Sequence, residues 1–152
     1  MDYLVFSLWF TVIHAVAYTV AGAIALNISK DLYEEKERVL DFLRNMSDEK
    51  ESKHVQRWFL PAQLLRGLIL SVVLWPIINL LGDLSFAVRF VFIAGLLFFY
   101  TDFASAIPFN NNIEGFVYMK PKYMKLKSFW KLYLETFIYS VIVGAAVSGL
   151  LF

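Results

Sequence analysis

The sequence contains no cysteine and only two histidines, His14 and His54. Without cysteine a disulfide-stabilised secreted domain is excluded, and one pair of histidines does not supply the ligand set of the usual zinc sites. We therefore expect no metal ion and no other cofactor. The net charge of +1 gives no sign of a surface for nucleic acid, so we expect no nucleic-acid partner.

Charged residues are also scarce, at 18% of the chain, whereas 59% of the residues are hydrophobic and the mean hydropathy is +0.60. Soluble domains are about 45–50% apolar, and a chain of about 150 residues buries only roughly 68–70% of its surface. The apolar excess is larger than such a core can hide from water. It therefore predicts a protein that lies in a lipid bilayer.

Long stretches with little or no charge predict the membrane spans. Residues 3–29 contain no Asp, Glu, Lys or Arg, and three other stretches hold only isolated charges. A transmembrane helix needs roughly 20 mostly apolar residues, whereas barrel strands are about 9–11 residues long and alternate in polarity. We therefore predict an all-α fold, an integral membrane four-helix bundle that forms a single membrane domain over residues 1–152. The four predicted spans comprise about residues 3–26, 58–81, 84–107 and 132–152.

The first span differs from a cleaved signal peptide, because residues 1–13 contain no Lys or Arg and the apolar stretch is long. We expect it to remain in the mature protein.

The turn between the second and third spans is very short, at Gly82 and Asp83. It predicts that these two helices are antiparallel neighbours.

Positive charges predict the orientation in the membrane. Seven of the Lys and Arg residues lie in the connection 27–57 and five in 108–131. Lys and Arg accumulate in cytoplasmic loops of membrane proteins. We therefore expect a multi-pass protein of the cell membrane, with both long connections cytoplasmic and both termini on the extracytoplasmic side.

The two long connections differ in pattern. Apolar residues at helical spacing in 27–57 predict a cytoplasmic helical extension between the first two spans, with a turn near Asn45–Ser47 and Ser47 as the N-cap of the returning helix. This extension is either a solvated connection or a docking site for a partner. Aromatic residues interleaved with lysines in 108–131 predict an amphiphilic interfacial connection, which either anchors the protein at lipid headgroups or covers a site.

Three ionisable residues lie at similar depth in the predicted spans, in the half nearest the long connections: Arg66, Asp102 and Glu135. Insertion of a charged side chain at the centre of a bilayer costs about 2.5–3.5 kcal/mol, so such residues usually face protein or water. We expect Arg66 to pair with Asp102, and Glu135 to be its second or alternative partner. With polar neighbours on the same helix faces, the candidate binding residues are Gln63, Arg66, Asp102, Glu135 and Tyr139.

The same cluster contains the catalytic candidates, which are His14, Arg66, Asp102 and Glu135. His14 or Glu135 could act as an acid or base while Arg66 holds a phosphate or carboxylate. The cluster could equally be an ion-pair network that fixes helix register, or a relay for protons or cations. No nucleotide-binding, metalloprotease or hydrolase motif occurs, so the sequence leaves open whether the protein is an enzyme.

Small residues form stripes on two predicted spans, Ala17, Ala21 and Ala25 on the first, and Gly144 with Ser148 on the fourth. Such stripes permit close helix packing, within one bundle or between subunits.

We expect a protein that acts through association in contact with membrane lipids, as a homo-oligomer or as a subunit of a membrane complex. The alternatives are a small membrane enzyme acting on a lipid or amphipathic substrate at the inner leaflet, and an oligomeric transporter or channel protomer. Pro76 predicts a kink in the second span.

Overall fold

The computed structural model describes residues 2–33, 43–107, 109, 111–119, 123 and 126–152. Every regular element among these residues is helical. In chain order the elements are α1 (Tyr3–Ile28), α2 (Lys30–Tyr33), α3 (Glu49–Leu74), η1 (Trp75–Ile77), α4 (Ile78–Asp83), α5 (Phe86–Gly95), η2 (Leu96–Phe103), α6 (Ile113–Tyr118) and α7 (Leu126–Leu150). Of these, η1 is a single turn of 3-10 helix and η2 is a π-helix.

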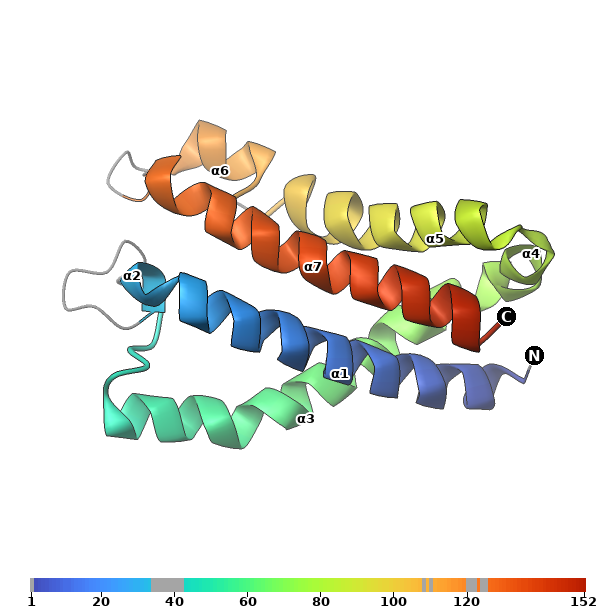
Figure 1. Cartoon of the computed structure of the whole chain (residues 1–152), viewed down its shortest axis with the longest axis horizontal. Helices are drawn as coiled ribbons and strands as arrows, with labels where there is room; N and C mark the ends of the chain where they lie inside the picture. The colour runs from blue at the N-terminus through green and yellow to red at the C-terminus, as the bar shows by residue number, and fades with distance from the viewer. Residues whose placement is uncertain (1, 34–42, 108, 110, 120–122, 124–125) are drawn as a thin grey trace.

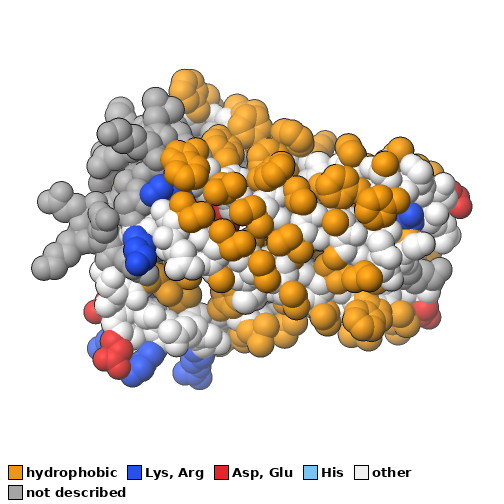
Figure 2. Space-filling model, in the orientation of Figure 1, with side chains coloured by type: hydrophobic (Ala, Val, Ile, Leu, Met, Phe, Trp, Pro, Cys, Tyr) orange, Lys and Arg blue, Asp and Glu red, His pale blue; other side chains and the backbone are white. Residues whose placement is uncertain are grey.

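Four helical segments are long and apolar enough to cross a membrane: Tyr3–Ile28, Glu49–Asp83, Phe86–Phe103 and Trp130–Leu150. The predicted all-helical chain with four candidate spans is therefore confirmed. The second segment begins well before residue 58, because the polar lead-in helix is continuous with the apolar part of α3. Figure 2 shows hydrophobic side chains spread along the middle of the molecule, with charged side chains toward its two ends, as expected for helices that contact lipid.

The spanning helices pack in the spatial order α3, α1, α7, α5. Helix α1 packs against both α3 and α7, and α7 packs against α5 (Figure 1). Both termini lie at one end of the bundle, and α2 and α6 lie at the other, which we call the α2/α6 end. Helices α3 and α5 do not pack along their lengths in the described part of the chain. The prediction that the second and third spans are neighbours is therefore wrong.

The kink at Pro76 explains this difference. Pro76 lacks a backbone N–H, and its ring clashes with the preceding turn, so the α-helix gives way to the 3-10 turn η1. The indole Nε1 of Trp75 donates to Ser7 Oγ at 2.9 Å and ties the kink to α1. After the kink the chain continues as α4, and it is α4, not α3, that the turn at Leu84–Ser85 joins to α5.

The core lies between α1, α7, α5 and the second half of α3. Its members are aliphatic and aromatic side chains, together with the small residues of α1: Phe6, Phe10, Ile13, Ala17, Ala21, Leu74, Ile78, Ile93, Leu97, Tyr139, Val143, Val147 and Leu151. The alanine stripe predicted on the first span is thus buried within this chain.

Gly144 is the point of closest approach between α5 and α7. A Cβ atom on Gly144 would lie 2.9 Å from Ala94 Cβ, 3.2 Å from Ala94 N and 3.2 Å from the carbonyl oxygen of Phe90. Only glycine therefore permits the observed contact. Ser148, one turn further along α7, is also buried, so this stripe packs inside the chain.

The connection after α1 is described only in part. Helix α2 begins the predicted extension, whereas residues 34–42 lie outside the described residues. The N-cap of α3 is Asp48 and not Ser47, because Asp48 Oδ1 accepts from Glu51 N at 2.9 Å, while the N–H of Ser47 donates to Asn45 Oδ1. The carboxylate of Glu51 in turn accepts from the backbone N–H of Asn45 and closes the turn.

The connection before α7 contains the short helix α6, whose N-cap is Asn112. Phe116, Val117 and Tyr118 on α6 are exposed, which agrees with an amphiphilic segment. Lys120, Lys122 and Lys125 lie outside the described residues, so contact with lipid headgroups stays a prediction.

Candidate functional site

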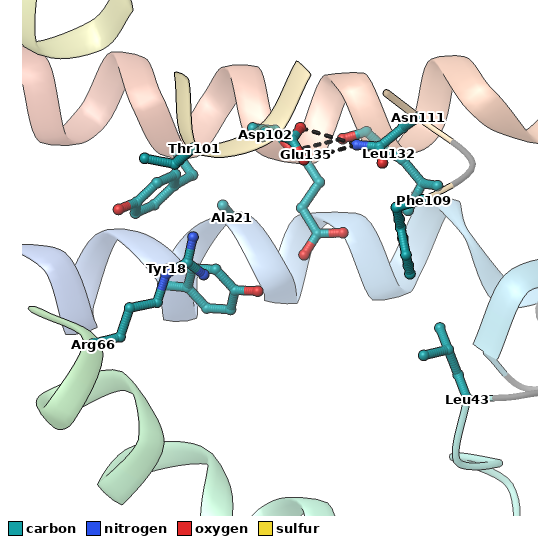
Figure 3. A pocket seen from close by; sticks show the side chains of 12 residues that line it. Tyr18, Ala21, Leu43, Arg66, Thr101, Asp102, Phe109, Asn111, Leu132 and Glu135 are labelled. Atoms are coloured by element: carbon teal, nitrogen blue, oxygen red, sulfur yellow. Dashed lines mark hydrogen bonds between the residues drawn. The ribbon is translucent and has the colours of Figure 1, made fainter. Parts of the chain in front are cut away.

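A cavity of about 320 Å³ lies between the four spanning helices toward the α2/α6 end, and we call it the polar pocket (Figure 3). Its wall combines the charged residues of three helices with tyrosine and threonine hydroxyls. The lining residues are Tyr18, Ala21, Leu43, Arg66, Thr101, Asp102, Phe109, Asn111, Leu132, Glu135, Thr136 and Tyr139. The three ionisable residues that were predicted to share one depth therefore do line one cavity.

Arg66 extends from α3 toward two aromatic rings. Its guanidinium carbon lies 5.3 Å from the centroid of the Tyr18 ring and 5.9 Å from that of Tyr139, in range for cation–π attraction. Among the described residues Arg66 forms no ion pair with either Asp102 or Glu135. The expected Arg66–Asp102 pair is thus absent, because α3 packs against α1 and not against η2, the helix that carries Asp102.

The carboxylate of Asp102 is instead held by a loop residue. Asn111 Nδ2 donates to both carboxylate oxygens, at 3.0 and 2.9 Å. Asn111 is only 3% exposed, and its Oδ1 has no hydrogen-bond partner in the described residues. Asp102 itself lies on the π-helix η2, a wide helical turn that often occurs at functional sites.

A second asparagine shapes the loop that carries Asn111. Asn112 Oδ1 accepts from Phe109 N at 3.0 Å and from Gly115 N at 2.7 Å, and Asn112 Nδ2 donates to the carbonyl of Ile107 at 2.6 Å. A Cβ on Gly115 would overlap the carbonyl of Phe109, so the tight turn requires glycine there. These bonds place Phe109 and Asn111 against the polar pocket.

A second cavity, of about 380 Å³, adjoins the first and shares Tyr18, Leu43 and Glu135 with it. We call it the apolar pocket, because most of its other lining residues are small or hydrophobic: Gly22, Ala25, Leu26, Met46, Val55 and Phe59, with Arg44 and Gln63. Tyr18 lines both cavities. The centroid of its ring is 6.0 Å from that of Phe59 and 5.5 Å from that of Tyr139.

His14 lines neither of these cavities. It is completely buried, with Nδ1 2.7 Å from Tyr139 Oη and Nε2 3.2 Å from Gln63 Oε1. This geometry fits the tautomer in which Nε2–H donates to Gln63 and Nδ1 accepts from the Tyr139 hydroxyl. His14 therefore positions one residue of each pocket and has no direct access to a ligand.

The structure brings most of the candidate residues together. Arg66, Asp102, Glu135 and Tyr139 line the polar pocket, and Gln63 lines the apolar pocket. Figure 3 shows Arg66 beside Tyr18 at one side and Asp102 with Asn111 at the other. The described residues include no group of three or more His, Cys, Asp or Glu that could hold a metal ion.

The sequence analysis did not predict Asn111 as a site residue, although the run of three asparagines at 110–112 was visible.

Comparisons of the chain with protein-family models, with curated proteins and with solved structures find no match.

Proposed function

We propose that the protein binds an amphipathic molecule within the membrane. The headgroup occupies the polar pocket, and the apolar chain occupies the apolar pocket. The observation that carries this proposal is the direct adjacency of the two cavities, which share Tyr18, Leu43 and Glu135. Such a pairing of hydrophobic walls with a few convergent polar groups is typical of small-molecule sites.

The state of Arg66 supports the polar half of the proposal. An arginine in a membrane span is costly unless it is paired or faces a cavity. Arg66 faces a cavity, has two tyrosine rings beside it and makes no ion pair with a described carboxylate. Its planar N–H donors are suited to a phosphate or carboxylate oxygen.

Gly22 supports the apolar half. A Cβ on Gly22 would meet no atom within 4 Å, so α1 leaves open space at this point of the apolar pocket. The small side chain of Ala25, one turn later, continues the same wall. An acyl chain that lay here would contact hydrophobic side chains and displace none of the polar contacts around His14.

The charge distribution sets the side of the membrane in this proposal. The cavities lie toward the α2/α6 end, from which both of the Lys- and Arg-rich connections extend. If these connections are cytoplasmic, the ligand comes from the inner leaflet of the cell membrane. The small-residue stripes that favoured association are used inside the chain, so binding of a ligand is the better supported function.

Filling the apolar pocket tests the proposal. Native mass spectrometry measures how much phospholipid binds to the detergent-solubilised protein when it is titrated with dioleoyl lipids. Gly22→Phe puts a ring into the open space, so we expect lipid binding to fall by about tenfold or more. Ala23→Phe is the matched control, because Ala23 is the next residue on α1 and is exposed. Equal binding by the two variants, with similar melting temperatures, would contradict the proposal.

A further inference from the structure

The headgroup class can be inferred from a buried acceptor on a residue that lines the polar pocket. Asn111 is 3% exposed, and its Nδ2 is used in two contacts with Asp102. Its Oδ1 receives no hydrogen bond from any described residue. Buried polar atoms are nearly always paired, so this oxygen indicates a donor on the molecule that the pocket holds.

The neighbouring side chains do not supply that donor. The Thr101 hydroxyl donates to the carbonyl of Leu97 at 2.6 Å, and the Thr136 hydroxyl donates to the carbonyl of Leu132 at 3.1 Å. Each hydroxyl is therefore committed to its own helix. The hydroxyl of Tyr139 is likewise committed, to His14.

The charges around Asn111 indicate what kind of donor fits. Asn111 Oδ1 lies on the side chain that also holds the Asp102 carboxylate, and Glu135 lines the same cavity. In the view of Figure 3, Arg66 is on the opposite side, with the Glu135 carboxylate between. The wall is thus acidic around Asn111 and basic at Arg66, which fits a headgroup with a cation at one end and an anion at the other.

We propose that the polar pocket recognises a zwitterionic headgroup with a primary ammonium, of the phosphoethanolamine type. The ammonium N–H groups donate to Asn111 Oδ1 and to the Asp102 carboxylate, and the phosphate oxygens accept from Arg66. This inference rests on the proposed binding of an amphipathic molecule and adds the chemistry of its headgroup. A primary ammonium has three donors, enough for both acceptors.

The inference distinguishes between headgroups of similar size. A choline headgroup keeps the positive charge but has no N–H donor, so it leaves Asn111 Oδ1 unpaired. A glycerol headgroup brings hydroxyl donors but no positive charge for Asp102. Sites that hydrogen-bond a ligand group reject analogues that lack it more strongly than apolar pockets reject a missing methylene.

The test measures affinity for three phospholipids with the same oleoyl chains and with ethanolamine, choline or glycerol headgroups. Native mass spectrometry of the wild-type protein should give at least about tenfold tighter binding of the ethanolamine lipid than of either other lipid. Asn111→Ala should reduce this preference to less than about threefold, with affinity for the choline lipid retained. Asn27→Ala is the matched control, because Asn27 is an exposed residue of α1 whose amide donates only to its own helix, at Ala23 O.

Two outcomes would overturn the inference. Equal wild-type affinity for all three headgroups would refute the ammonium contact even if Asn111→Ala does not fold, because that series needs no variant. A preference for the ethanolamine lipid that persists in Asn111→Ala would refute the role of Asn111. If the three lipids bind equally but Gly22→Phe abolishes binding, the headgroup inference fails and the proposed function stands. If Gly22→Phe also changes nothing, the proposed function fails with it.

Discussion

The contact at Gly144 predicts a large difference between two alanine substitutions. In Gly144→Ala the new Cβ lies 2.9 Å from Ala94 Cβ and 3.2 Å from two backbone atoms, Ala94 N and Phe90 O. Backbone atoms of a packed helix cannot move aside as a flexible side chain would, so α5 and α7 have to separate. Overpacking of this kind costs about 1–3 kcal/mol.

Gly22→Ala is the control, because its Cβ meets no atom within 4 Å. Both substitutions replace a helical glycine with alanine, so the gain in helix propensity is common to both and cancels in the comparison. The difference between the variants is therefore the packing cost alone. For a chain of this length 1 kcal/mol corresponds to about 2–4 °C, which predicts that Gly144→Ala melts roughly 2–12 °C below Gly22→Ala.

Intrinsic tryptophan fluorescence during heating in a mild detergent measures both melting temperatures on the same scan. Gly144→Leu extends the series, since a larger side chain at the same contact should lower the melting temperature further. If Gly144→Ala and Gly22→Ala melt at the same temperature, α5 and α7 do not approach each other at Gly144 and the helix order α3, α1, α7, α5 is wrong.

Three other predictions follow from the geometry. A cysteine at Lys53 should react with a membrane-impermeant reagent only from the cytoplasmic side and one at Asp83 only from outside, and the reverse pattern would refute the orientation. Arg66→Met should destabilise the protein by less than the roughly 3–5 kcal/mol lost on breaking a buried ion pair, which a thermal melt measures. The same variant should bind phospholipid about tenfold more weakly or worse in a lipid titration, and unchanged affinity would contradict the role of Arg66 in binding. His14→Leu leaves Tyr139 and Gln63 without their partner, so thermal melts should show a loss of about 1–3 kcal/mol, and an unchanged melting temperature would mean that these contacts do not form.

The spans were predictable because hydropathy acts locally. A stretch such as residues 3–29, which has no charged residue, has few alternatives to a membrane helix. The kink at Pro76 was predictable for the same reason, since the effect of proline on a helix depends only on its own turn. The convergence of Arg66, Asp102 and Glu135 on one cavity also followed from sequence, because depth in the membrane is a simple function of position along a span.

The helix order and the partners of the charged residues were not predictable in this way. A short turn at Gly82–Asp83 predicted that the second and third spans are neighbours. In the structure these two residues end the helix α4, and η1 separates α4 from α3. Because α3 packs on α1 and not on α5, Arg66 and Asp102 lie at different sides of one cavity and meet different partners. Asn111 was missed because a run of asparagines shortly after a proline is typical of a loop, and its contact with Asp102 depends on how that loop folds back over η2.

The central claim is that one amphipathic molecule occupies both pockets. A high-resolution density map of the protein in phospholipid nanodiscs tests it most directly. The proposal predicts one continuous elongated density that runs from Arg66, Asp102 and Asn111 past Tyr18 to Gly22 and Phe59. Cavities without such density, or an Arg66 side chain that has turned away to lipid or to a carboxylate, would contradict the claim.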